Sequence, residues 1–143
     1  MLITNHVLSG ALVGLAVRRP AAAFVVGVAS HVALDVTPHW GDERHGVFLK
    51  VAVVDGLVGL ATMAAVTRAC PPGRRPAVVA GMLGACAPDA DKPGTVFFGR
   101  SPFPGVVDEW HRRIQHESPR RAVQEPLVAT ALALAVRGVL RGR

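Results

Sequence analysis

Five apolar stretches divide this chain, and the acidic and His residues are confined to alternate connections between them. The stretches cover residues 2–17, 20–36, 51–67, 76–88 and 126–140. If they run up and down as an antiparallel bundle, their connections alternate between two ends. One end then receives arginines without any acid or histidine: Arg18, Arg19, Arg68, Arg74, Arg75, Arg137, Arg141 and Arg143. The other end receives all ten Asp and Glu residues and all six His residues, so the sequence predicts an all-α fold with one polar, potentially metal-binding face.

The composition favours helices packed in lipid. Half of the 143 residues are hydrophobic, but only 5% are aromatic and Tyr is absent. Ala, Val, Leu and Gly dominate, and such small residues let membrane helices approach closely. A full span needs about 20 residues, so the helices are either short, partly submerged membrane helices or buried helices of a compact soluble domain. Five apolar segments in so short a chain favour the membrane, and we expect about five short transmembrane or membrane-embedded helices.

The order of these segments indicates one helical membrane domain over residues 1–143 built from two related hairpins. Pro20 and Pro76 each follow an Arg-Arg pair, and Asp35 and Asp91 lie equally far beyond those prolines. Each hairpin would therefore bring an acidic motif to the same face, where two half-sites can meet. The expected parts are a hairpin at 2–36, a second at 51–88, a polar connection at 89–125 and a C-terminal helix at 126–140.

The net charge of +6 raises the question of nucleic-acid binding. The basic residues, however, lie at the ends of apolar segments, which indicates membrane topology and contact with anionic lipids. No recognition helix or zinc finger accompanies them, so we expect no nucleic-acid partner. Lys and Arg are equally numerous at the two ends, so the positive-inside rule alone does not orient the chain. The arginine end has its arginines directly at the helix ends without acids, and we therefore expect it to be cytoplasmic and the metal face extracytoplasmic.

Ser30-His31-x-x-x-Asp35-x-x-x-His39 is the first chemistry-bearing pattern. A spacing of four places His31 and Asp35 on one helix face, one turn apart. Imidazole and carboxylate so placed can both bind a divalent ion, or Asp35 can orient His31. The alternative is a hydrogen-bonded pair that only stabilises a helix end.

Two further patterns lie in the second half of the chain. Pro88-Asp89-Ala90-Asp91 offers two carboxylates beyond a helix-ending proline, which can converge on one cation or bridge two. His111-Arg112-x-x-x-His116 offers two imidazoles and a guanidinium for an anionic substrate oxygen. The alternatives are an exposed acidic turn for the first and a solvated basic helix for the second.

Two isolated residues near the same face are further candidates. His6 stands close to the start of the first apolar stretch and can act as a metal ligand or as a packed helix-start residue. Asp55 interrupts an apolar run, and burying it without a partner would cost several kcal/mol. We therefore expect Asp55 to find a metal, a His or an Arg as its partner.

Together these patterns resemble a family of bacterial and archaeal inner-membrane proteins described as metal-dependent hydrolases. The resemblance rests on Asn5-His6 with Gly10, Ser30-His31-x-x-x-Asp35, Pro88-Asp89-Ala90-Asp91 and His111-Arg112-x-x-x-His116. The order departs from the family, in which the Ser-His-x-x-x-Asp pattern follows the Pro-Asp-x-Asp pattern. Two related hairpins with exchanged motifs would build the same site, and a sister family with its own role would show the same order. The resemblance implies a multi-pass protein of the bacterial cytoplasmic membrane with a metal site.

We therefore expect a hydrolase that uses one or two divalent ions, Zn or Mn, to cleave a phosphoester or ester bond of a lipid-like or anionic substrate. The expected metal ligands are His6, His31, Asp35, His39, Asp89, Asp91 and His111. The expected catalytic residues are Arg112 as a substrate clamp, with Asp55 and His116 in acid–base or supporting roles. Two alternatives remain: a non-catalytic membrane protein with a structural or sensory metal site, and a transport-type protein with an ion relay.

Overall fold

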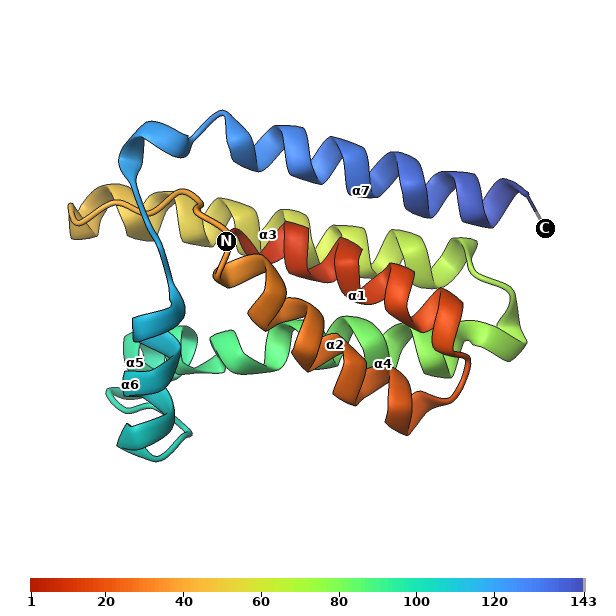
Figure 1. Cartoon of the computed structure of the whole chain (residues 1–143), viewed down its shortest axis with the longest axis horizontal. Helices are drawn as coiled ribbons and strands as arrows, with labels where there is room; N and C mark the ends of the chain where they lie inside the picture. Colours follow the sequence, from red (N-terminus) through yellow and green to blue (C-terminus); the bar gives the residue numbers. More distant parts are fainter. Residues whose placement is uncertain (143) are drawn as a thin grey trace.

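The computed structural model describes residues 1–142, and within that range the chain is α-helical without any strand (Figure 1). This confirms the predicted all-α class. The α-helices are α1 (Ile3–Val17), α2 (Pro20–Asp35), α3 (His45–Ala69), α4 (Arg75–Cys86), α5 (Asp91–Phe98), α6 (Gly105–Ile114) and α7 (Gln124–Arg141). Short 3-10 turns η1 (Pro72–Arg74), η2 (Ala87–Ala90) and η3 (Pro119–Arg121) lie between them.

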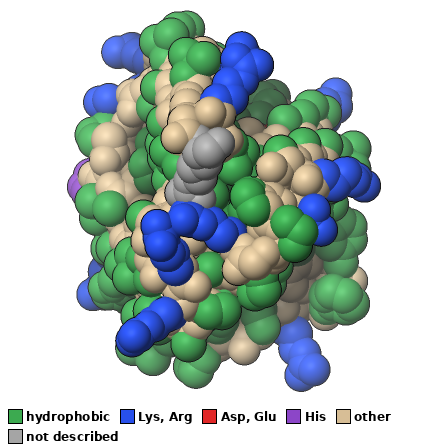
Figure 2. All heavy atoms as spheres, turned by 90° about the vertical axis from the view of Figure 1, so that its right-hand side faces the viewer, with side chains coloured by type: hydrophobic (Ala, Val, Ile, Leu, Met, Phe, Trp, Pro, Cys, Tyr) green, Lys and Arg blue, Asp and Glu red, His purple; other side chains and the backbone are tan. Residues whose placement is uncertain are grey.

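The long helices alternate in direction along one common axis (Figure 1). Helices α1, α3 and α7 start near one end of the molecule, and α2 and α4 return to it. Helix α6 instead lies across that end. The opposite end shows Lys and Arg side chains among hydrophobic ones, and no acidic side chain is visible there (Figure 2).

Helix α4 packs against both α1 and α2, and glycines make the contact possible. A Cβ atom added to Gly10 would collide with the backbone carbonyl of Gly81, and one added to Gly81 would collide with that of Gly10. Gly27 meets the same carbonyl of Gly81, and Gly84 meets that of Phe24. The three backbones therefore touch directly, as in closely packed membrane helices.

The two expected hairpins do not pack alike. Helices α1 and α2 lie against each other, whereas α3 touches α4 much less and contacts mainly α1. The reason is that α4 packs on both α1 and α2, which leaves α3 in contact mainly with α1. The acidic ends of α2 and α4 meet for this reason. The site is therefore formed by packing of the first hairpin against α4, and packing of α3 against α4 contributes little to it.

Helix α3 is the one helix in the described range that is long and apolar enough to cross a membrane. It has 25 residues, or about 37 Å at 1.5 Å per residue, and very little of its apolar surface is buried. It begins at His45, before the expected apolar stretch at 51–67, because Val47, Phe48 and Leu49 continue its apolar pattern. Helices α1 and α2 are apolar but shorter, with 15 and 16 residues.

The connection at 89–125 contains more helix than the sequence indicated. It holds part of η2, then α5, α6 and η3, whereas the sequence indicated only a polar connection. Helix α6 begins after Pro104, whose fixed φ suits the position before a helix, and ends at Ile114. This segment carries half of the candidate site to the polar end of the bundle.

Candidate metal centre

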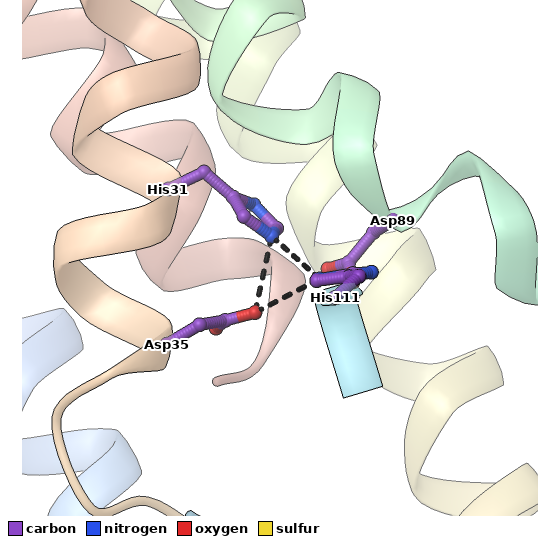
Figure 3. Close-up of side chains that lie close together, drawn as sticks. All are labelled: His31, Asp35, Asp89 and His111. Carbon is purple, nitrogen blue, oxygen red and sulfur yellow. Dashed lines mark hydrogen bonds and ion pairs between the residues drawn. The ribbon is translucent and has the colours of Figure 1, made fainter. Parts of the chain in front are cut away.

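Four buried side chains from three elements meet at the polar end (Figure 3). His31 and Asp35 come from the last turns of α2, Asp89 comes from η2, and His111 comes from α6. One ligand atom from each residue lies within 4.8 Å of the others. We call these four residues the metal-centre cluster.

Local structure explains how each element delivers its side chain. His31 and Asp35 are four residues apart on one helix, and His31 Nε2 lies 3.1 Å from Asp35 Oδ2. After Cys86 the chain tightens into the 3-10 turn that contains Pro88 and turns Asp89 inward. The interior side of α6 then presents His111, which is only 3% exposed.

The spacing of three of the four ligand atoms is close to that in a tetrahedral metal site. Zn²⁺ holds its ligand atoms at about 2.0–2.1 Å, which separates neighbouring ligand atoms by about 3.3 Å in a tetrahedron. His31 Nε2 lies 3.1 Å from His111 Nε2, and His111 Nε2 lies 3.2 Å from Asp35 Oδ2. The fourth residue, Asp89, places Oδ1 3.8 Å from His111 Nε2. The cluster can therefore hold a metal ion with small adjustments.

Both imidazoles are fixed with Nε2 facing the cluster. His31 Nδ1 donates a hydrogen bond of 2.7 Å to the carbonyl oxygen of Ala85. His111 Nδ1 donates to Asp91 Oδ2 at 3.2 Å. Because each Nδ1 holds the proton of the neutral ring, each Nε2 presents its lone pair, which is the usual arrangement for metal-binding histidines. Asp91 thus acts in the structure as the partner of His111.

A lysine lies beside the cluster and sets its charge. Lys92 Nζ is 2.7 Å from Asp89 Oδ1. Burial alone would raise the pKa of Asp89, but the charges of Lys92 and nearby histidines lower it to about 2. Burial would lower the pKa of Lys92, but Asp89 raises it. Asp89 is therefore ionised and Lys92 protonated at neutral pH.

His111 carries a proton readily when no metal is bound. Its hydrogen bond to Asp35 raises the pKa of His111, and the hydrogen bond to Asp91 adds to this effect; the pKa reaches about 9. A divalent cation would replace that proton, since metal ligands must be deprotonated. The two carboxylates Asp35 and Asp89 would then balance the charge of the ion.

His6 lies next to the cluster in a position that lacks hydrogen-bond partners. Its ring stacks on His31 with centroids 4.0 Å apart. His6 Nε2 is 3.2 Å from Asp35 Oδ1 and 3.9 Å from Asp89 Oδ2, yet neither ring nitrogen makes a hydrogen bond although the side chain is fully buried. Asp35 Oδ1 also accepts a hydrogen bond from the Met1 amino group at 2.7 Å.

Two of the other expected site residues have different partners. His39 is buried, donates from Nδ1 to the carbonyl of Thr37 at 2.8 Å, and lies with Nε2 3.7 Å from Glu117. Asp55 accepts hydrogen bonds from the backbone amides of Ile3 and Thr4 and from the Thr4 hydroxyl. The partner of Asp55 is thus the start of α1. We expected a metal, a His or an Arg, and that expectation was wrong. A carboxylate there complements the helix dipole.

The remaining two expected catalytic residues are on the surface. Arg112 pairs with Glu109 one helical turn away, and its side chain is 74% exposed. The side chain of His116 is exposed, while its backbone carbonyl accepts a hydrogen bond from the amide of His39. The four side chains of the cluster do not include either residue.

Two residues of the centre were not anticipated from the sequence. Lys92 pairs with Asp89, and Gln115 donates from its side-chain amide to Asp35 Oδ2 at 3.1 Å. A signal existed for both: Lys92 directly follows the Pro-Asp-x-Asp pattern, and Gln115 is four residues after His111, on the same side of the chain.

Comparisons with protein-family models, with curated proteins and with solved structures found no match to this chain. The functional proposal below therefore rests on the chemistry and geometry of the side chains.

Proposed function

We propose that the protein is a multi-pass membrane hydrolase of the bacterial cytoplasmic membrane that uses divalent metal to cleave a phosphoester or ester bond of a lipid-like substrate. The single observation that carries the proposal is the metal-centre cluster: two imidazole nitrogens and two carboxylates, buried, with their ligand atoms within 4.8 Å. A mixture of His and carboxylate ligands favours Zn²⁺ or Mn²⁺ over Ca²⁺.

The distribution of apolar side chains supports the membrane placement. Large hydrophobic side chains are exposed along α2, α3 and α7, for example Val25, Leu57 and Leu127 at 64–66%. The interior holds the polar centre and a hydrophobic cluster that includes Leu15, Val78 and Met82, with glycines where the helices touch. Soluble monomers rarely expose so much contiguous apolar surface, whereas lipid accommodates it. Helix α3 would cross the bilayer, and α1, α2, α4 and α7 would be the shorter embedded helices.

The open side of the cluster is the side of Lys92. The side chain of Lys92 is 32% exposed and that of Asp91 is 20% exposed, whereas His31 and Asp35 are fully buried. A substrate would therefore approach past Lys92, whose ammonium group can bind a phosphate or carboxylate oxygen. Lys92 is better placed for this than Arg112, which points to Glu109.

The chain's own residues would hold and orient the reacting groups. Ala85 and Asp91 fix the two imidazoles, and Gln115 fixes Asp35. A bound divalent ion would polarise the scissile group and lower the pKa of water for attack near neutral pH. Burial of the cluster excludes bulk water from every side except that of Lys92.

A second ion, in place of the Met1 ammonium group, would find ligands in His6 and the other oxygens of the same carboxylates. Asp35 and Asp89 each direct one oxygen toward His31 and His111 and the other toward His6. His6 Nε2, which lies 3.2 Å from Asp35 Oδ1, would supply a nitrogen ligand there. Two carboxylates that each bridge two positions are typical of two-metal hydrolytic sites.

The test compares Asp89→Asn with Glu43→Gln, which removes the same charge from an exposed residue of the polar end. Metal content of the purified protein is measured by mass spectrometry, and hydrolysis is measured on phosphodiester and carboxylester lipids. We expect Asp89→Asn to lose metal and turnover and Glu43→Gln to keep both. Wild-type protein that binds no divalent metal at neutral pH would refute the proposal.

The buried contacts among His6, His31, Asp35 and His111 also fit a relay that moves protons without metal, because each lies within 3.2 Å of a neighbour. A third possibility is a metal that only stabilises the fold. Chelation separates the three. A hydrolase keeps its helices but loses turnover, a structural site loses helical stability, and a relay keeps its pH-dependent flux in vesicles.

A further inference from the structure

The hairpin of α5 and α6, residues 91–114, exposes an unusual group of apolar side chains. Phe98 is 80% exposed, Val106 77% and Phe97 71%. Val96, Val107 and Trp110 are also exposed on this hairpin. Among the described residues it holds three of the four exposed aromatic side chains, the other being Phe24 of α2.

The orientation of α6 suits a helix that lies in a membrane surface. Helices α3 and α7 follow the long axis of the bundle, whereas α6 lies across its polar end (Figure 1). If α3 crosses the bilayer, α6 lies roughly in the plane of the bilayer. Its side chains divide accordingly: Val106 and Trp110 share one face, a turn apart, while His111 turns inward.

Cationic side chains accompany this apolar surface. Arg100, Arg112 and Arg113 are exposed on the hairpin or its turn. Arg112 and Arg113 both pair with Glu109, which leaves the hairpin surface with an excess of positive charge. An amphipathic helix with Trp on one face and Arg on another is typical of segments that bind at the boundary between headgroups and acyl chains.

We propose that the α5–α6 hairpin is an interfacial anchor that inserts Phe97, Phe98, Val106 and Trp110 at the headgroup–acyl boundary of the bilayer. The inference rests on the proposed membrane placement, which it deepens. The same hairpin carries Asp91, Lys92 and His111, so the anchor holds the open side of the metal centre at headgroup depth. The bond to be cleaved is then one in the glycerol or headgroup region of a membrane lipid.

The test uses Trp110 as a depth probe in the full-length protein. Wild type and Trp110→Phe are reconstituted in vesicles of phosphatidylcholine and phosphatidylglycerol, so that the difference between their spectra isolates Trp110 from the buried Trp40. The lipids carry bromine near the top or near the middle of the acyl chains. We expect the Trp110 fluorescence to be quenched by both, and more strongly by the shallow bromines.

Two variants test the anchor itself. Phe97→Ser combined with Phe98→Ser should weaken the quenching of Trp110 and shift its emission to the red. Phe24→Ser, which changes the exposed aromatic outside the hairpin, should leave both unchanged. If Phe24→Ser has the same effect as the double variant, the hairpin has no special role and the inference fails.

The remaining outcomes also decide the matter. A protein that floats with vesicles but shows no bromine quenching of Trp110 overturns the anchor and leaves the membrane placement intact. Shielding of Trp110 from aqueous acrylamide without bromine quenching would mean that protein, not lipid, covers the hairpin. Failure to float with vesicles overturns both the anchor and the membrane placement. Metal content, measured in parallel, reports separately on the hydrolase proposal.

Discussion

Single residues in this protein are fixed by hydrogen bonds that decide which atom faces the centre. His31 and His111 each donate a hydrogen bond from Nδ1 to a neighbouring oxygen, so that Nε2 faces the cluster. His6 differs, because both of its ring nitrogens are buried without a hydrogen bond. Leaving a buried polar group unpaired costs about 1–3 kcal/mol, so an ion beside His6 would remove a real penalty.

If the proposed second ion binds beside His6, replacing His6 with alanine should remove it. The ion held by His31 and His111 should stay, because His6 does not belong to their set of four ligands. Metal stoichiometry by mass spectrometry checks this, with His45→Ala as the control because His45 is an exposed histidine of the same end. Unchanged stoichiometry in His6→Ala would show that His6 does not hold an ion.

Metal affinity should increase with pH over the range in which His111 loses its proton. The pKa of His111 is raised to about 9 by Asp35 and then Asp91 in the metal-free protein. Below that pH the ion must displace a proton, so the affinity should rise about tenfold per pH unit for one displaced proton and level off above it. Calorimetric titration in buffers of different ionisation enthalpy measures the proton release. Binding that is independent of pH between 6 and 9 would contradict the participation of His111.

Among the helices, α1 shows how the polar end is held together. Asp55 of α3 accepts hydrogen bonds from Ile3 and Thr4, and Glu125 of α7 accepts them from Leu2 and Asn5. The free amide groups at the start of α1 are thus satisfied by carboxylates from two other helices. These contacts tie the outer helices α3 and α7 to the buried α1.

We expect Asp55→Ala to destabilise the protein while the metal content is retained. The substitution leaves backbone amides of α1 without an acceptor, at a cost of about 1–3 kcal/mol. Thermal unfolding measures the loss, and Val54→Ala, an exposed neighbour, serves as the control. A stable Asp55→Ala protein that lacks turnover would instead support the catalytic role that the sequence suggested.

The contact between α1, α2 and α4 should be equally sensitive to added volume. In Gly81→Ala the new methyl group meets the carbonyl of Gly10, so the helices must separate. We expect a loss of about 1–3 kcal/mol, the usual cost of overpacking. Gly56→Ala, where the methyl group meets open space, should be neutral or stabilising by up to about 1 kcal/mol. Equal unfolding temperatures for the two variants would contradict the direct backbone contact.

For the whole molecule, the confinement of acidic residues to one end predicts an orientation for the proposed membrane protein. The arginine end shows no acidic side chain (Figure 2), and the opposite end carries the metal-centre cluster. Lys and Arg are equally numerous at the two ends, but those of the arginine end directly flank the apolar helices, as is typical of the cytoplasmic side. The metal centre and the α5–α6 hairpin would then face the outside of the cell.

Cysteine labelling in whole cells tests this orientation. In a cysteine-free background, Glu43→Cys marks the polar end and Gly73→Cys in η1 marks the arginine end; both residues are exposed. A membrane-impermeant maleimide should label Glu43→Cys in intact cells and Gly73→Cys only after permeabilisation. The reverse result would invert the orientation, and equal labelling of the two would argue against a chain that crosses the membrane.

The sequence predicted the parts of the site that depend on local spacing. The interval between His31 and Asp35 places them on one helix face, and Pro88 marks where α4 gives way to the turn that carries Asp89. Expected candidates with the same residue types, such as His39 and His116, are nevertheless outside the cluster. The residue type and its position at the polar end reduce the number of candidate ligands. They do not predict which of these side chains come together.

By itself, the sequence determined the helical class and the separation of charge between the ends, because periodic apolar runs and the residues at their boundaries act over short distances. Only the tertiary structure decided which side chains meet. The direct contact of α4 with α1 and α2 through Gly10, Gly27 and Gly81 brings the ends of α2 and α4 together. Helix α6, which lies across that end, adds His111 to them. The physical reason is that ligand convergence depends on how closely backbones approach and how a distant helix is laid across them, and neither quantity is encoded in any one local pattern.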